Sequence, residues 1–320
     1  MERRDVKAKA ATEGCRRRPR HMGQRAQPKT PLYGLDVAIL PTGSSPMKIV
    51  ECEPRRFGSD PVRTEADSRA ALLAKPLAAD VTYLSVPWSI LINQRRTQKF
   101  APIDCDGGFA ICQHVRFREI VPLLKQCRVR VLFTPHAVRD FPGLDVRGMP
   151  HSPAVDVVPS AKRWLYSFVG FVSHPVRRAL FGMRHPANTV MVMREHWHFG
   201  RRRCGYRERE FGRILSQSRF SLCPRGSGPG TIRFWESLCA GAIPVLIADG
   251  LKLPVGPCWE DTVVRCPEGN VQDLEEIIRG IDPEREALLR RNCLLASETF
   301  ARAGLVEPVR QYYRERINGA

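Results

Sequence analysis

Two hydrophobic patterns alternate along most of the chain. Short apolar runs typical of buried strands alternate with segments in which apolar residues recur every three or four positions, as on the core-facing side of a helix. The predicted strands are 33–40, 81–86, 109–113, 129–133, 164–169, 189–193, 220–223, 243–248 and 262–264. The predicted helices are 89–98, 115–126, 175–182, 206–216, 232–240, 271–279, 283–300 and 308–317. This alternation predicts an α/β protein with parallel sheets.

One break in the pattern divides the chain. Residues 141–160 hold four prolines and two glycines, a composition typical of a linker, and the polar residues 51–68 are a further predicted loop. We therefore expect two domains. The predicted parts are a basic, disordered tail at 1–32, an N-terminal domain at 33–145, a linker at 146–160, a C-terminal domain at 161–300 and a last helix at 301–320.

The most informative stretch is 218–254, which has the pattern of a strand, a glycine-rich turn, a helix and a second strand. Thr231 stands where its hydroxyl could cap the helix N-terminus, and Gly241 stands where the helix should end. A helix N-terminus after a glycine-rich turn offers free backbone N–H groups and a favourable dipole to an anion. The stretch is therefore a candidate anion site.

Three charged residues indicate which ligand groups that site could bind. Arg225 in the turn and Arg233 in the first helical turn could both reach a phosphate, because an arginine fork suits two phosphate oxygens. Glu236, one turn deeper, could accept two hydroxyl hydrogen bonds, as from a ribose. The alternative interpretation is a surface turn with solvated arginines and a helical salt bridge.

Commoner phosphate and nucleophile motifs do not fit. Gly226, Gly228 and Gly230 follow G-x-G-x-G spacing, whereas the dinucleotide fingerprint is G-x-G-x-x-G. The sequence contains neither a Walker motif nor a G-x-S-x-G elbow. What remains is a site for a sugar nucleotide or another diphosphate ester.

Candidates for a general base lie in the N-terminal half. His136 follows the predicted strand 129–133, at the end that faces the ligand crevice in open α/β sheets. Asp104 and Asp106 lie in the loop 101–108. For His136 the alternative is a histidine that only fastens a loop by hydrogen bonds. The segment Glu195–His198 has no further ligands at recognisable spacing, so no metal site is expected.

The amino-acid composition indicates which binding partners and which cellular compartment to expect. The formal net charge is +18, and residues 1–30 hold ten Lys and Arg against three Asp and Glu. Such an excess suits phosphates, acidic glycans, nucleic acid or an anionic membrane surface. Eleven scattered cysteines cannot all pair internally, which favours a reducing compartment. Without an apolar run long enough to span a membrane, or a signal-peptide core, a cytoplasmic or membrane-peripheral location is expected.

The central stretch CPRGSGPGTIRFWESLCAGAIPVLIAD resembles the signature of exostosin-type glycosyltransferases, family GT47. Weaker likenesses at 83–90, 112–124, 132–137 and 166–180 extend the resemblance over roughly residues 80–300. The resemblance implies two Rossmann-like domains facing a cleft (a GT-B fold). It also implies a nucleotide sugar bound by the C-terminal domain, inversion at the anomeric carbon, and no metal or other cofactor. By position, the donor-binding residues would be Arg225, Gly226, Thr231 and Arg233, with Glu236 on the ribose and Arg177 as a weaker diphosphate ligand.

The functional hypothesis is therefore glycosyl transfer in polysaccharide biosynthesis. A sugar would move from a nucleotide-sugar donor, expected to be UDP-linked, to a hydroxyl of a glycan acceptor. His136 is the first candidate for the base, followed by Asp104 and Asp106. Contact with an anionic membrane is compatible with the charge, and no specific nucleic-acid partner is expected. The alternative is a catalytically inactive basic protein that binds acidic glycan or nucleic acid.

Overall fold

The computed structural model describes residues 36–40, 42–58, 62–155, 157–195 and 205–318. The predicted tail at 1–32 and the histidines of Glu195–His198 lie outside the described residues. Residues 31–320 belong to one compact unit. Within it the described strands form two sheets, each with its own hydrophobic core.

The first sheet contains six strands in chain order, of which β1 is antiparallel to β2 and the others are parallel. Its strands are β1 (Val37–Leu40), β2 (Lys48–Cys52), β3 (Thr82–Ser85), β4 (Phe109–Ile111), β5 (Val131–Thr134) and β6 (Asp145–Gly148). Its helices are η1 (Pro54–Gly58), α1 (Arg63–Ala74), α2 (Trp88–Asn93), η2 (Thr97–Lys99), η3 (Phe117–Ile120) and α3 (Val121–Gln126).

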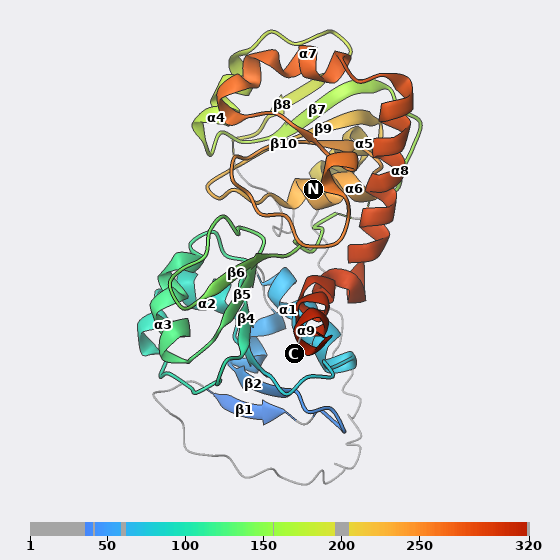
Figure 1. Ribbon diagram of the computed structural model, residues 1–320. Helices are drawn as coiled ribbons and strands as arrows, with labels where there is room; N and C mark the ends of the chain where they lie inside the picture. Colours follow the sequence, from blue (N-terminus) through green and yellow to red (C-terminus); the bar gives the residue numbers. More distant parts are fainter. Residues whose placement is uncertain (1–35, 41, 59–61, 156, 196–204, 319–320) are drawn as a thin grey trace, which may run out of the picture. The chain divides into compact units, whose positions relative to one another are not determined.

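Side-chain alternation along these strands builds two cores. Tyr83 and Phe109 pack in one cluster with residues of α1 and of the chain's last helix, whereas Leu84 and Ala110 pack in another with residues of α2 and α3. Because successive side chains of a strand point to opposite faces, apolar residues at neighbouring positions bury both faces. Figure 1 shows α2 and α3 on one side of β4 and β5, and α1 and α9 on the other.

Two sequence predictions were wrong in this half. Part of the loop predicted at 51–68 is regular structure, since β2 runs to Cys52 and α1 begins at Arg63. α1 buries Thr64, Glu65 and Ser68 against the rest of the fold, so its core-facing side is polar and gives no apolar periodicity. The linker predicted to begin at 146 overlaps β6, an edge strand that pairs with β5.

The second sheet is parallel, in the order β11-β10-β9-β7-β8. Its strands are β7 (Trp164–Gly170), β8 (Val190–Met193), β9 (Ser218–Pro224), β10 (Ile243–Ile247) and β11 (Val264–Arg265). Its helices are α4 (Pro175–Gly182), α5 (Gly205–Ser216), α6 (Ile232–Cys239), η4 (Trp259–Asp261), η5 (Glu268–Asp273), α7 (Leu274–Arg279) and α8 (Pro283–Phe300). The chain leaves β7 outward to β8 and returns to β9, so the topological switch point lies between β7 and β9.

The end of the chain returns to the first sheet. α8 starts where predicted, with the Asp282 carboxylate accepting from the Arg285 backbone N–H at 2.7 Å, and it buries Cys293 in the second core. The following η6 (Arg302–Val306) and α9 (Glu307–Asn318) instead contribute Val306 and Val309 to the first core. The last helix was predicted from the sequence, but its packing on the first sheet was not.

The fold class is confirmed as α/β with two Rossmann-like halves and a cavity lined by both, the GT-B arrangement predicted above. In the described part of the chain no helix is long and apolar enough to cross a membrane. No disulfide joins any two of the nine described cysteines.

Candidate functional site

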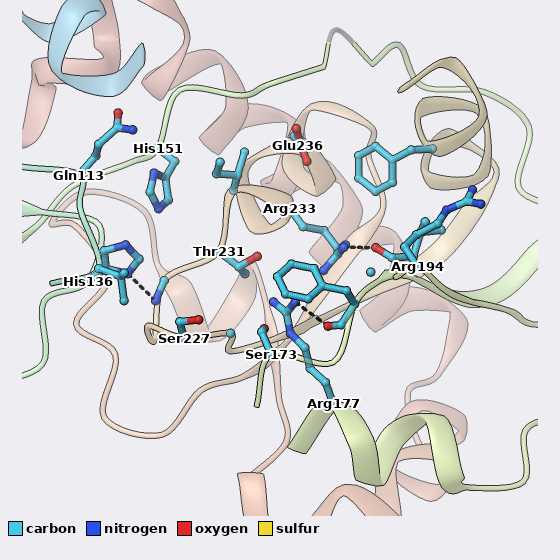
Figure 2. Close-up of a pocket in the computed structure, with 18 of the residues that line it drawn as sticks. Gln113, His136, His151, Ser173, Arg177, Arg194, Ser227, Thr231, Arg233 and Glu236 are labelled. Carbon is cyan, nitrogen blue, oxygen red and sulfur yellow. Dashed lines mark hydrogen bonds between the residues drawn. The ribbon is translucent and has the colours of Figure 1, made fainter. Parts of the chain in front are cut away.

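A cavity of about 440 Å³ lies where the strands of both halves end. Gly170 at the end of β7 and the turn that follows β9 line it, which places it at the switch point of the second sheet. Figure 2 shows Gln113, His136 and His151 along one side of this cavity and Arg177, Arg194 and Arg233 along the other. It therefore has one wall from each half of the protein.

The glycine-rich turn packs closely against the loop that follows β5. A Cβ atom on Gly230 would lie 2.1 Å from the Pro135 carbonyl oxygen, and one on Gly228 would lie 2.5 Å from a Val115 methyl group. The Gly230 N–H donates to His136 Nδ1 at 3.1 Å (Figure 2). These glycines are therefore required by close approach to the first half of the protein, in addition to any ligand.

α6 begins after Thr231, whose backbone is extended as an N-cap should be. The Thr231 hydroxyl makes no capping hydrogen bond, so that part of the prediction was wrong, and the first bond is Phe234 N–H to the Thr231 carbonyl at 3.2 Å. The threonine side chain instead lines the cavity. α6 buries Leu238 in the core and brings Arg233 and Glu236 to the cavity.

Two arginines form the charged wall. Arg177 of α4 is only 7 % exposed and donates to the carbonyl oxygens of Arg225, Pro224 and Phe171 at 2.8, 3.1 and 3.3 Å. Arg233 donates to the Val169 carbonyl, and its buried Nε has no partner among the described residues. The ring of Phe168 lies 4.5 Å from the Arg233 guanidinium carbon and 5.6 Å from that of Arg177.

The positive charge of this wall is only partly compensated, through the nearby Glu236 carboxyl and the Arg194–Glu210 pair. Within the described ranges neither Arg177 nor Arg233 forms an ion pair with a carboxylate. Burial lowers the pKa of both guanidinium groups, and the nearby Arg233 charge lowers that of Arg177 further, to about 9. A bound anion would relieve both effects, so the arrangement favours a phosphate or diphosphate ligand.

The Arg225 side chain does not lie at the cavity, where it was predicted. Its guanidinium lies 3.5 Å from the Glu268 carboxylate, and it is not among the described residues that line the cavity. Only its backbone carbonyl contacts a cavity arginine, by accepting a hydrogen bond from Arg177. Arg177, the weaker candidate from the sequence, therefore lies at the cavity, as does Gly226, whose Cα is packed beside the Arg177 guanidinium.

Glu236 is buried, at 2 % exposure, and lines the cavity. Its carboxylate accepts a hydrogen bond from the Ala154 N–H at 3.0 Å, in the segment that joins the two halves. Burial raises its pKa to about 7, and the Arg233 charge opposes this rise. Backbone hydrogen bonds from Ala154 and Val155 thus fix the carboxylate, which keeps lone pairs for further donors.

His136 lies at the cavity as predicted, and is 6 % exposed. Burial lowers its pKa to about 4, which makes the imidazole neutral at pH 7. Its Nδ1 already accepts from Gly230, so that nitrogen is not available to take a proton. The ring centroid of His151 lies 5.2 Å away, edge to face. This hydrogen bond joins the two halves, as in the alternative weighed from the sequence, and the role of His136 as the base stays a prediction.

Asp104 and Asp106 do not reach the cavity. Both are exposed and pair with Arg128, and neither is among the described lining residues. They precede β4, whereas the cavity opens beyond its other end, at Gln113. A carboxylate at the amino end of a parallel strand cannot serve a site at the carboxyl end, so the structure gives no support to these two base candidates.

Several lining residues were not found from the sequence. They are Ser89, Asn93, Gln113, His114, His151, Ser173 and Arg194. Ser89 and Gln113 follow β3 and β4, so the rule that picked out His136 could have found them. His114, His151, Ser173 and Arg194 likewise follow the ends of β4, β6, β7 and β8, whereas nothing in the local sequence distinguishes Asn93. Among the described residues no group of three or more His, Cys, Asp or Glu could hold a metal ion.

Comparison with known proteins finds a matching domain and similar sequences for the second half of the chain. Residues 143–281 match the exostosin GT47 domain. Exostosin-1 of Drosophila melanogaster is 29 % identical over 159 residues, which cover 44 % of this chain and 21 % of that protein. A probable beta-1,4-xylosyltransferase of Arabidopsis thaliana, IRX10L, is 38 % identical over 93 residues (28 % of this chain, 22 % of the relative). The chain thus spans about a fifth of the length of these relatives.

Two further comparisons complete this picture. A probable glucuronosyltransferase of Oryza sativa subsp. japonica, GUT1, is 34 % identical over 88 residues (27 % of this chain, 21 % of that protein). The solved structure of MurG from Acinetobacter baumannii aligns with 73 % of this chain and 74 % of its own at 10 % identity, with a TM-score of 0.32, which is too low to add to the fold assignment. The resemblance predicted from the central stretch is confirmed: residues 143–281 match the exostosin GT47 domain, and exostosin-1 is among the similar proteins.

Proposed function

We propose that this protein is a glycosyltransferase that moves a sugar from a nucleotide-sugar donor, UDP-linked, to a hydroxyl group of a glycan, with inversion at the anomeric carbon. One observation carries the proposal. Two buried arginines of the matched segment 143–281, without carboxylate partners among the described residues, face a cavity that both halves line. A diphosphate is the anion whose charge and two phosphate groups match two guanidinium groups.

The donor would lie along the wall of the second half. Arg177 and Arg233 would hold the diphosphate beside the start of α6, where the helix dipole also favours negative charge. Glu236, one turn further along α6, would accept hydrogen bonds from the ribose hydroxyls. Phe171 would supply apolar surface for the rest of the donor.

The chemistry follows from the position of the charges. When the bond between the anomeric carbon and the phosphate breaks, negative charge grows on the departing diphosphate. Guanidinium groups that are already buried and held by backbone carbonyls stabilise that charge without reorganising, which is electrostatic catalysis. We expect the reaction to proceed in the presence of a chelator.

The acceptor would lie along the wall of the first half. The groups there are neutral hydrogen-bonding side chains, among them Ser89, Asn93 and Gln113. Neutral donors and acceptors suit the hydroxyls of a sugar, as the charged wall suits the donor. This division matches the one implied by the resemblance, with the donor on the C-terminal half.

A thermal-shift screen of nucleotide sugars, with and without EDTA, tests the proposal and names the donor. One UDP-sugar at saturating concentration should raise the melting temperature by several degrees, and EDTA should not abolish the shift. Incubation of that donor with oligosaccharides, followed by mass spectrometry, should then show a product heavier by one sugar. Absence of both the shift and the product would overturn the proposal.

The net charge of +18 is also compatible with one alternative, a basic protein that only binds acidic glycan or nucleic acid. Such binding weakens steeply as salt rises, because each neutralised phosphate or sulfate releases counterions. Steep salt dependence of polymer binding together with no response to any nucleotide sugar would favour this alternative.

A further inference from the structure

A carboxylate that the sequence did not single out lies directly behind the acceptor-side wall. Glu65 of α1 is 0 % exposed. It accepts from the Ser89 hydroxyl at 2.7 Å, from the Ser89 N–H at 3.2 and 3.3 Å, and from the Gln113 N–H at 3.0 Å. These donors are neutral, as is the Cys112 thiol that also hydrogen-bonds to the carboxyl, and among the described residues no ion pair involves Glu65. A buried carboxyl without a counter-ion is uncommon and points to a role beyond packing.

Its two partners are both part of the cavity wall. Ser89 lies in α2, just beyond the end of β3, and Gln113 lies just beyond the end of β4. Since the Ser89 hydroxyl donates its proton to Glu65, its oxygen keeps lone pairs for a donor from the cavity. One hydroxyl group thus connects the cavity with a buried proton acceptor.

Two of the three histidines at this wall are already engaged in hydrogen bonds, and the third, His151, packs edge to face on His136, with its pKa held well below the usual range by burial. His136 Nδ1 accepts from Gly230 at 3.1 Å. His114 Nδ1 accepts from the Arg116 N–H at 3.0 Å, and its Nε2 lies 2.9 Å from the Asn93 side-chain oxygen. A histidine in either position would have to break a bond of the wall before it could take a proton.

We propose that the proton of the acceptor hydroxyl leaves through Ser89 to Glu65. The inference rests on the proposed function. The acceptor oxygen bonds to the anomeric carbon, and the bond from that carbon to the phosphate oxygen breaks, with the electron pair leaving on the nucleoside diphosphate. As the acceptor proton passes to Ser89 Oγ, the proton of Ser89 passes to Glu65, giving a neutral carboxylic acid and a regenerated serine hydroxyl. Ser89 touches the acceptor, and Glu65 is a positioning residue that acts through it.

The surroundings of Glu65 allow this role at neutral pH. Burial raises its pKa to about 7, and its hydrogen bonds to Ser89 and Gln113 limit the rise. Cys112 and Tyr83 are the titratable groups closest to it, and burial raises the pKa of both, so they stay neutral below pH 8. The charged pair Glu51–Arg69 lies beyond Tyr83. Transfer should therefore increase with pH through a limb near 7.

The pKa of Glu236 on the opposite wall is also about 7, so mutations must show which of the two carboxyls causes the pH limb. In Glu65→Gln, transfer should fall by about 100-fold or more, the usual effect of losing a general base, and the limb near pH 7 should disappear. Calorimetric affinity for UDP should stay within about twofold of wild type, because Glu65 does not line the donor wall. The limb should persist in Glu236→Gln.

Variants of Ser89 test whether its hydroxyl passes the proton from the acceptor to Glu65. Ser89→Ala should lose transfer to the same degree as Glu65→Gln, whereas Ser89→Thr, which keeps the hydroxyl, should retain most of it. The matched control is Ser68→Ala, because Ser68 is also buried on α1 but its hydroxyl has no partner among the described residues. It should transfer at the wild-type rate.

Two results would overturn the relay. One is wild-type transfer with an unchanged pH limb in a Glu65→Gln protein whose melting curve shows it folded. The other is equal transfer by Ser89→Ala and Ser89→Thr. If the wild-type protein neither binds UDP nor transfers any sugar, the proposed function fails instead, and the two failures are thereby distinguished.

Discussion

The two walls of the cavity are built in opposite ways. The wall of the second half is charged, and its main residues come from the turn after β9, the start of α6 and the nearby α4. The wall of the first half is neutral, and its residues come from four separate segments that follow β3, β4, β5 and β6. Recognition of an anion is thus nearly local in the sequence, whereas recognition of the acceptor depends on how the strands are arranged.

The comparison also separates two energetic roles. Arg177 and Arg233 are held by backbone carbonyls and form no ion pair among the described residues, so the proposed diphosphate would gain electrostatic energy there. Glu65 and its uncharged hydrogen-bond donors form a network whose value lies in its geometry. Mutations in the charged wall of the second half should therefore affect donor binding, and mutations in the neutral wall of the first half should affect transfer.

The largest expected effect is at Arg177. Arg177→Ala should lower kcat/KM by about 100- to 1000-fold, since it removes a preorganised cation from the departing diphosphate. Steady-state kinetics with the donor found in the screen would measure this. Arg178→Ala is the matched control, because Arg178 is the next residue of α4 and is exposed. Equal kinetics for the two variants would place the diphosphate elsewhere.

A smaller effect is expected where the walls meet. Gly230→Ala would place a Cβ 2.1 Å from the Pro135 carbonyl oxygen, so the loop and the His136–Gly230 hydrogen bond must shift. We expect a loss of about 2 kcal/mol in the free energy of unfolding, as for other overpacked sites, measured by denaturant titration.

The control for this variant is Gly182→Ala. Gly182 ends α4, and a Cβ there would meet nothing within 4 Å. Its unfolding free energy should stay within about 0.5 kcal/mol of wild type. If Gly230→Ala is equally mild, the turn does not pack against the first half as described.

The sequence predicted the second half well and the first half incompletely. From β7 to α8 nearly every element was found, because buried parallel strands and amphipathic helices have strong periodicity. α1 was missed because its buried side carries Thr64, Glu65 and Ser68, which resemble the polar residues of a loop. The same feature hid the carboxylate now placed behind the acceptor wall.

Prediction of the site was also incomplete, because sequence spacing does not show which distant residues are in contact. Arg233, Glu236 and His136 were found because motif spacing and strand ends indicate position. Arg225 was assigned to the cavity because spacing alone cannot show that a side chain pairs with Glu268. The role of His136 also depends on a contact with Gly230 across 94 residues, which no local pattern reports.

The central claim is that the paired cations of the second half hold a nucleoside diphosphate. Calorimetric titration of UDP, in EDTA, into wild type, Arg233→Ala and Arg279→Ala tests it most directly. Arg279 is an exposed arginine of α7 paired with Glu275, so its loss removes the same charge away from the cavity. We predict binding to wild type and Arg279→Ala with affinities within about twofold, and at least about tenfold weaker binding to Arg233→Ala. Equal affinity for all three proteins would contradict the claim.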